Sequence, residues 1–371
     1  MVFSAAIVGA GAIGCHIAYC LRKANCDVYV VARGETLDAL STHGLRITVC
    51  GEVHVETALK VVAAEDTSMC GPVDYLVLTV KMYSLEGGLL DAIKPLIGPH
   101  TTILPPTTAL PYWWCYKLDG KYNGMQIPAL DPDGKLWATL PPQQCLGLTY
   151  WCSAVQESPG VVNVKHIQRG YPVGELGRGS AASTRATRFA DALRHGNVPA
   201  PVVEDIRSEI FIKAVNSMAF NAVAVLSGAT NGQMADCKSS VETLRSIMAE
   251  LEQLSTAMDL PLRQNADERI FQTLASRAHT MSMLHDLQQG KDLEAAALFG
   301  SFQALAALVG VSLPLTTVLV QLIELRKIVV DEALTLAVHY ARTEAAPHKI
   351  HETTGVTPAV SSTASASRSK L

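Results

Sequence analysis

The feature that most limits what this chain can fold into lies at its start. An apolar run over residues 5–8 breaks into Gly9, Gly11 and Gly14, at G-x-G-x-x-G spacing, and a helical pattern follows over residues 12–23. In a strand, turn and helix, the first glycine permits the tight turn and the second lets backbone N–H groups approach a pyrophosphate. The third lets the helix pack closely on the strand. The stretch predicts the opening of a dinucleotide-binding domain, and a glycine-rich turn without a ligand is the alternative.

The end of the next predicted strand bears on which dinucleotide binds. Residues 27–32 are β-rich, and Arg33, Gly34 and Glu35 follow them. An acid at this strand end usually takes the ribose 2′-hydroxyl of NAD, whereas an arginine can neutralise the 2′-phosphate of NADP. Arg33 therefore favours NADP. Glu35 keeps an NAD site as the alternative, and a solvated surface charge is the other interpretation of Arg33.

Three further strand signals extend this predicted sheet region. Residues 45–55 alternate around a glycine like a hairpin, residues 73–80 form a continuous apolar run, and residues 102–104 are strand-like. The second run leads into Lys81, on the side of a parallel sheet where ligands bind. We expect Lys81 to contact the cofactor or to help close the active site, with a surface lysine as an equal alternative.

The segment that leaves the strand at 102–104 is proline-rich and aromatic. It runs from Pro105 to Trp114 and includes Thr107, Thr108 and Ala109. Its prolines stiffen it and its aromatic rings would suit a pocket wall, while ordinary packing is an equal interpretation. Beyond it we expect a turn-rich segment at 117–146, β-like segments at 147–154 and 161–166, and a helix at 183–195.

From Asp205 onward the pattern changes to long helices with few strand signals. A chain of 371 residues suggests two domains. We predict an α/β domain of Rossmann type over 1–204 and an all-α substrate and catalytic domain over 205–342. Residues 343–371, rich in Ala, Ser and Thr, predict a disordered tail.

Charge and cysteine content exclude several classes of function. The net charge of −4 comes without basic clusters, which argues against nucleic acid and against an anionic membrane surface. Nine scattered cysteines form neither C-x-x-C pairs nor a metal-ligand spacing, so we expect reduced thiols, no metal and a cytoplasmic protein. Polar residues and Pro314 interrupt the apolar stretch 295–323, which predicts two buried helices rather than a membrane span.

The helical half contains the residues best suited to chemistry. Lys213, Ser217 and Asn221 are four apart and share one helical face, with Asn216 on its flank. Such polar groups in an apolar helix need partners, and a stripe facing solvent or the other domain is the alternative. Further on, Ser282 is followed twelve residues later by Glu294, which heads another apolar helix. An acid near a helix start is usually just favourable for the helix dipole, and this is the alternative interpretation of Glu294.

Taken together, these motifs resemble the ketopantoate reductases (2-dehydropantoate 2-reductases), over nearly the whole chain to about residue 342. The resemblance is carried by the following residues: Gly9, Gly11, Gly14, Val31 to Gly34, Val80-Lys81, the Pro105 to Trp114 loop, Lys213 to Asn221, Ala229-Thr230, Ser282 to Leu284 and Glu294. It implies a Rossmann domain, a helical domain and an active site in the cleft between them.

The resemblance also implies a role for each site residue. Lys213 would protonate the keto oxygen as NADPH delivers hydride, and Glu294 would position the substrate and the lysine. Ser282 and Asn221 would bind substrate oxygens, while Arg33 and Lys81 would serve the cofactor. The chemistry agrees, because an ammonium beside a developing alkoxide both stabilises its charge and donates the proton.

Two positions depart from the family pattern. Many members carry Gln-Asn-Gly where this chain has Thr107, Thr108 and Ala109, and asparagine where it has Ser217. Hydroxyls are shorter than amides and make fewer oriented contacts. We therefore expect ketopantoate to be a poor substrate, and a bulkier keto substrate to rest on the Tyr112 to Trp114 segment.

The sequence thus predicts an NADPH-dependent reductase of a 2-keto acid or related ketone, with a small-molecule keto substrate as its partner. A dinucleotide-binding sensor that has lost catalysis is the alternative of a different class, although a proton donor such as Lys213 argues against it. A non-pantoate biosynthetic substrate, an imine substrate, the oxidative direction and a homodimer all stay open.

Overall fold

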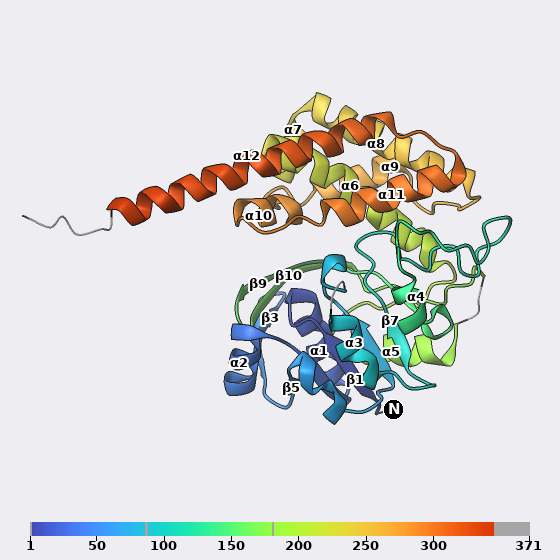
Figure 1. The fold of residues 1–371 in the computed structure, drawn as a ribbon, viewed down its shortest axis with the longest axis vertical. Helices are drawn as coiled ribbons and strands as arrows, with labels where there is room; N and C mark the ends of the chain where they lie inside the picture. Colours follow the sequence, from blue (N-terminus) through green and yellow to red (C-terminus); the bar gives the residue numbers. More distant parts are fainter. Residues whose placement is uncertain (1, 86–87, 180–181, 345–371) are drawn as a thin grey trace, which may run out of the picture.

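The first half of the molecule is built around a parallel sheet. The computed structural model describes residues 2–85, 88–179 and 182–344 (Figure 1). Five strands lie in the order β5-β2-β1-β6-β7, and all neighbours run parallel. These strands are β1 (Ser4–Val8), β2 (Asp27–Val31), β5 (Lys60–Val62), β6 (Tyr75–Leu78) and β7 (Thr102–Leu104). All four residues of β6 are buried, as expected for a strand covered on both faces. The strands predicted at 5–8, 27–32, 73–80 and 102–104 are confirmed.

A second, mixed sheet of four strands lies beside the first, in the order β4-β3-β10-β9. The remaining strands are β3 (Leu45–Val49), β4 (Glu52–Glu56), β8 (Gly147–Leu148), β9 (Trp151–Ser158), β10 (Val161–Gly170) and β11 (Val173–Gly174). β3 and β4 form the predicted hairpin, whose turn includes Gly51 with a φ of 94°. The β-like segments after residue 146 therefore lie outside the parallel sheet: β9 and β10 join β3 and β4, and β8 pairs with β11.

Helices and short turns connect the strands of the first half. They are α1 (Ala12–Lys23), α2 (Gly34–His43), α3 (Leu89–Ile93), α4 (Lys135–Thr139) and α5 (Thr184–Arg194), with short 3-10 turns η1 (Ala64–Met69), η2 (Met82–Leu85), η3 (Lys94–Leu96) and η4 (Pro142–Gln144). α1 and α5 share one apolar core with β1 and β2. Ser183 caps α5 by accepting from the N–H of Ala186, so the helix begins where the sequence predicts.

The second half is helical and centres on α6. Its helices are α6 (Ile206–Ser227), α7 (Asn231–Asp236), α8 (Lys238–Ala257), α9 (Ala266–Leu274), α10 (Ser282–Gln288), α11 (Ala295–Val309) and α12 (Pro314–Glu344). α6 packs against α8, α10, α11 and α12, and these helices lie together on one side of the sheets (Figure 1). The Asp205 carboxylate caps α6, and Gly228, with a φ of 74°, ends it.

α6 is also the one helix of the described residues that is long and apolar enough to cross a bilayer. Its mean hydropathy over the most apolar window is 1.5, yet 72% of that window is buried inside the protein. Helices of this kind form the centre of large soluble cores. The apolar surface of α6 is therefore accounted for by packing against its neighbours.

The predicted pair of helices over 295–323 is confirmed. α11 ends at Val309, Gly310 has a φ of 75°, and Pro314 opens α12. α12 continues through Glu344, two residues beyond the predicted end of the helical domain, and residues 345–371 lie outside the described residues.

The aromatic segment after β7 packs inside the protein. Tyr112 is 2% exposed, and Trp113 and Trp114 are completely buried. The ring of Trp114 lies 6.1 Å from that of Phe211 in α6, and its Nε1 points to the sulfur of Met258 at 3.4 Å. Of the two interpretations, ordinary packing is correct. The expectation that a bulky substrate rests on these rings is wrong, because no face of them reaches solvent.

Candidate active site

The glycine turn after β1 has the shape that a pyrophosphate needs. Gly9 has a φ of 107°, and a Cβ there would lie 2.9 Å from Cγ1 of Val80. A Cβ on Gly14 would lie 2.0 Å from the carbonyl oxygen of Gly9, so the helix touches the turn directly. A Cβ on Gly11, in contrast, would meet nothing within 4 Å. Because Gly11 also begins α1 without a side-chain cap, the first N–H groups of that helix face open space.

Arg33 lies next to this turn, at the end of β2. It precedes α2 as its N-cap residue and its side chain is exposed. Glu35, in the first turn of α2, is exposed as well. Because β2 neighbours β1, Arg33 lies at the carboxyl edge of the sheet, where the adenosine ribose of a dinucleotide is expected. The residues at this edge therefore fit a dinucleotide.

Lys81, just after β6, is paired with two acids of the helical half. Its Nζ lies 2.6 Å from Oε2 of Glu294 and 3.4 Å from Oδ2 of Asp286. Asp286 belongs to α10 and Glu294 directly precedes α11, so the three side chains join the two halves of the chain. Burial disfavours the charge of Lys81, but the two carboxylates outweigh it and raise its pKa. Lys81 is held as an ammonium.

Lys213 lies in the third turn of α6, in a different setting. Its Nζ is 5.2 Å from the centre of the Tyr150 ring, within the range of a cation–π contact. Burial lowers the pKa of Lys213, while Cys152 and Glu294 oppose that lowering. Glu294 itself contacts Lys81 rather than Lys213. The carboxylate therefore acts on Lys213 through space, and the two lysines share one acid.

A buried polar cluster lies next to Lys213. Tyr150 directly precedes β9 and Cys152 lies at its start, and Sγ of Cys152 is 3.3 Å from the hydroxyl of Tyr171. That hydroxyl is 2.5 Å from Nδ1 of His16 in α1, whose pKa burial lowers to about 4. The cluster connects the helix of the glycine turn with Lys213. Sequence reasoning missed these residues, because nothing in a β-like segment says which helix its side chains face.

Asn221 lies two turns beyond Lys213, and both ends of its amide contact the protein. Its Oδ1 accepts a hydrogen bond from the N–H of Met283 at 3.0 Å, and its Nδ2 donates to the carbonyl oxygen of Ser217 at 2.7 Å. α10 has no side-chain cap from its own N-cap residue, so Asn221 of α6 supplies the acceptor. Asn221 thereby fixes the start of α10, where Ser282 lies. Its predicted contact with a substrate oxygen stays a prediction.

The remaining predicted residues lie around the same region. Ser217 is half-buried on the Lys213 side of α6, and Ser282 is exposed at the first residue of α10. Thr108 is the one partly exposed residue between Pro105 and Pro111. Asn216 points elsewhere, because its Oδ1 accepts from the buried guanidinium of Arg269 at 3.0 Å. The predicted face of Lys213, Ser217 and Asn221 therefore excludes Asn216.

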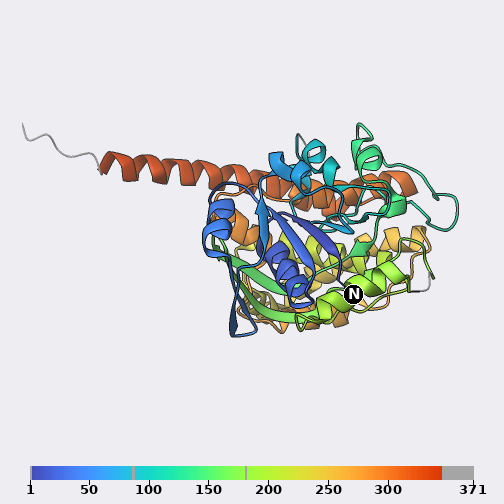
Figure 2. The same cartoon turned by 90° about the horizontal axis from the view of Figure 1, so that it is seen from below.

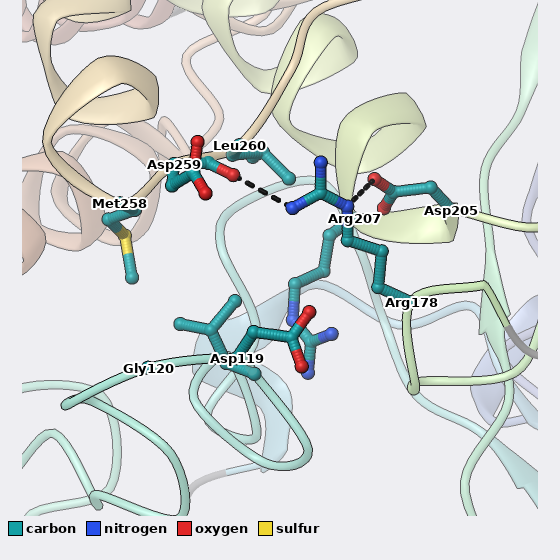
Figure 3. Close-up of a pocket in the computed structure, with 9 residues that line it drawn as sticks. Asp119, Gly120, Arg178, Asp205, Arg207, Met258, Asp259 and Leu260 are labelled. Atoms are coloured by element: carbon teal, nitrogen blue, oxygen red, sulfur yellow. Dashed lines mark hydrogen bonds and ion pairs between the residues drawn. The ribbon is translucent and has the colours of Figure 1, made fainter.

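A separate cavity of about 120 Å³ lies at the start of α6, and Figure 3 shows its lining. Arg178 bridges the main-chain oxygen of Asp259 at 2.9 Å and the carboxylate of Asp205 at 3.8 Å. Beside it, the buried guanidinium of Arg207 donates to three main-chain carbonyls, those of Trp114, Tyr116 and Leu176. This cavity joins loops of both halves and contains none of the predicted site residues. Across the described residues, no group of three or more His, Cys, Asp or Glu side chains could hold a metal.

Comparison with known proteins shows the family to which this chain belongs. The family model "Ketopantoate reductase PanE/ApbA" matches residues 5–106, and its C-terminal counterpart matches residues 205–327, together more than half of the chain. A 2-dehydropantoate 2-reductase of Mesorhizobium japonicum is 33% identical over 307 residues, which are 82% of this chain and 91% of that protein.

Solved structures agree with the sequence relatives. A protein of Ralstonia solanacearum MolK2, provisionally named a ketopantoate reductase, is 31% identical, with a TM-score of 0.78, and the match covers 88% of this chain and 98% of that one. D-mandelate dehydrogenase, solved with NADH and anilino(oxo)acetate, shares the fold at 19% identity, with a TM-score of 0.71 over 89% of this chain and all of that one. The chain belongs to the ketopantoate reductase family and is an oxidoreductase that acts on a C=O or CH–OH group.

Proposed function

We propose that this chain uses NADPH to reduce a 2-keto acid, with Lys213 as the proton donor. The observation that carries the proposal is the position of Lys213. It is a half-buried lysine with a lowered pKa, within electrostatic reach of the same Glu294 that binds Lys81 beside the glycine turn. A general acid works best when its pKa lies near the working pH, and burial moves Lys213 in that direction.

The residues of this chain divide the work of the reaction. NADPH, when bound, supplies the hydride that reduces the carbonyl carbon. The Lys213 ammonium stabilises the negative charge that develops on the carbonyl oxygen and then transfers its proton there, which leaves the neutral amine and the hydroxy acid. Gly11 and the start of α1 would hold the pyrophosphate. The pair of Lys81 and Glu294 fixes the edge of the cleft that faces α10.

Arg33 supports NADPH as the preferred cofactor. Its exposed guanidinium follows β2, at the place for a 2′-phosphate, and makes no ion pair with a described residue. The exposed Glu35 is the feature that would favour NAD instead. We also place the protein in the cytoplasm, because all nine cysteines are free thiols.

The substrate we propose is a 2-keto acid other than ketopantoate. Thr108 is the residue of its loop that reaches the surface, and Ser217 lies one turn beyond Lys213. Each offers a single hydroxyl, where an asparagine would offer a donor and an acceptor at fixed separation. A site loses discrimination for a polar substrate when such pairings are absent.

One set of kinetic measurements tests cofactor and substrate together. We expect NADPH to bind more tightly than NADH by about 1.5–3 kcal/mol, and Arg33→Ala to remove most of that preference. We expect kcat/KM to be poor for ketopantoate, better for other 2-keto acids, and shifted toward ketopantoate by Thr108→Asn with Ser217→Asn. Equal affinity for both cofactors would contradict the role of Arg33. Efficient turnover of ketopantoate with other 2-keto acids inferior would contradict the substrate, and a lack of turnover with every keto acid would indicate a binding protein instead.

A further inference from the structure

α12 is apolar on two opposite faces. Its inner face packs on the helical core, where Thr316 and Ile323 are buried, and the Glu250 carboxylate fixes its start by accepting from the N–H groups of Leu315 and Thr316 at 2.8 and 2.7 Å. A surface helix ordinarily turns charged residues to solvent on its other face. The outer face of α12 departs from that pattern, and it carries what we call the outer stripe.

The outer stripe is a row of large apolar side chains that nothing in the described structure covers. Its members lie on one side of the helix and are between 45% and 57% exposed: Val318, Leu322, Leu325, Val329 and Leu336. Their spacing alternates between three and four residues up to Val329, as in the seam of a coiled coil. Both views show the C-terminal part of α12 extending beyond the other helices, so a second helix could lie along it (Figures 1 and 2).

Several apolar residues are placed symmetrically about Val329. Leu322 and Leu336 lie seven residues before and after it, and Leu325 and Ala333 lie four before and after it. The flanking charges are also placed symmetrically, but with opposite signs. Arg326 lies three residues before Val329 and Glu332 three after it, and both side chains are exposed.

From this self-complementarity we infer that the outer stripe binds the outer stripe of a second copy of the chain, with the two helices antiparallel about Val329. In this arrangement Leu322 lies level with Leu336 of the partner subunit, and Arg326 lies level with the partner subunit's Glu332. A parallel arrangement would instead set like charges side by side, which is unfavourable. A lipid surface fits less well, because helices that lie on membranes carry Lys and Arg on their polar face, whereas Glu324 and Glu332 are exposed here.

The mass of the full chain in solution tests this inference. Sedimentation equilibrium should give a monomer of 39.6 kDa at low concentration and twice that mass as the concentration rises. Leu322→Glu with Leu325→Glu should weaken the dimer by more than about a hundredfold, since it places charges among the apolar side chains of the contact. Ile328→Glu is the matched control. Ile328 is 55% exposed but lies about 100° around the helix from Val329, so the dimer should persist.

A charge swap separates this dimer from other contacts. Arg326→Glu should weaken association by about threefold to tenfold, and adding Glu332→Arg in the same chain should restore it, because only an antiparallel pair brings the two positions level. Reductase activity at saturating substrate reports that each variant is folded. A chain that stays monomeric overturns the inference. This holds whether the outer stripe then proves to bind residues 345–371 of the same chain or lipid vesicles. A dimer that the paired leucine substitutions leave unchanged also overturns it.

Discussion

Lys81 and Lys213 both interact with Glu294, but their surroundings give them opposite properties. Lys81 extends from the sheet and touches two carboxylates, at 2.6 and 3.4 Å, which raise its pKa. Lys213 extends from the centre of α6 toward the ring of Tyr150, and burial lowers its pKa. The contrast follows from position, because Lys81 lies where the segment after β6 meets α10 and the start of α11, whereas Lys213 lies against the ring of Tyr150.

This difference divides the two lysines by function. A lysine held between two acids keeps its proton at every physiological pH, so it can bind an anion or stabilise a closed cleft but cannot act as a proton donor. A lysine with a lowered pKa can give up its proton and regain it in each turnover. The proposed roles of Lys213 as the acid and Lys81 as a fixed charge therefore rest on environment rather than on residue type.

The largest expected effect comes from removing the proton donor. Lys213→Ala should lower kcat by about 10²–10⁴-fold and leave NADPH binding nearly intact, because the side chain acts only when charge develops on the substrate. Steady-state kinetics and NADPH titration measure the two effects. Unchanged turnover would place the chemistry on another residue, and Lys81→Ala is the comparison that shows whether the two lysines have exchanged roles.

The next effect concerns the support of α10, the helix that carries Asp286. Asn221→Ala leaves the buried N–H of Met283 without an acceptor, so it should lower the free energy of unfolding by about 1–3 kcal/mol. Ser217→Ala is the matched control. Asn221 donates to the main-chain oxygen of Ser217, which this substitution keeps. Urea unfolding of the two variants tests the idea, and similar losses in both would show that Asn221 does not support α10.

A smaller effect should follow from the aromatic neighbour of Lys213. Tyr150→Leu removes the ring that stabilises the ammonium, so the pKa of Lys213 should fall further. Activity requires the protonated lysine and is lost as the pH rises through that pKa. The alkaline limb of kcat/KM should therefore move to lower pH by about 0.5–1.5 units.

Tyr150→Phe is the control for that substitution. It keeps the ring and removes a buried hydroxyl that has no hydrogen-bond partner in the structure, so the alkaline limb should stay in place. If the leucine and phenylalanine variants shift the limb equally, the ring does not stabilise the charge of Lys213.

The same contrast shows how far the sequence could predict this molecule. The glycine turn, α1, β2 and the capped ends of α6 follow from local patterns, so their bounds were predictable within a few residues. The common face of Lys213 and Ser217 follows from helix periodicity. The partners of Lys81 do not follow from any local pattern, because Asp286 is 205 residues away in the sequence and meets Lys81 only through packing of the two halves of the chain.

The aromatic segment after β7 shows the same limit, because its composition does not show what its side chains pack against. Its composition allowed either a pocket wall or core packing, and both predict the same residues. The buried position of Trp113 and Trp114 depends on α6 and on the segment after α8, which local pattern cannot place. Residue type alone therefore identified the segment but not the direction in which it faces.

The smallest effect we predict tests whether the two lysines share Glu294. This carboxylate favours the charged form of both lysines, although burial still lowers the pKa of Lys213 overall. Asp286 contributes to the pKa of Lys81 and not to that of Lys213. Glu294→Gln should therefore move the alkaline limb of kcat/KM to lower pH by about half a unit, through space, in addition to any loss of turnover. Asp286→Asn, which removes the same charge from Lys81 alone, should leave that limb in place. The pH profiles of the two variants are compared at matched ionic strength, because salt screens such an interaction. If both variants shift the limb equally, Lys81 rather than Lys213 controls it, and the assignment of the proton donor is reversed.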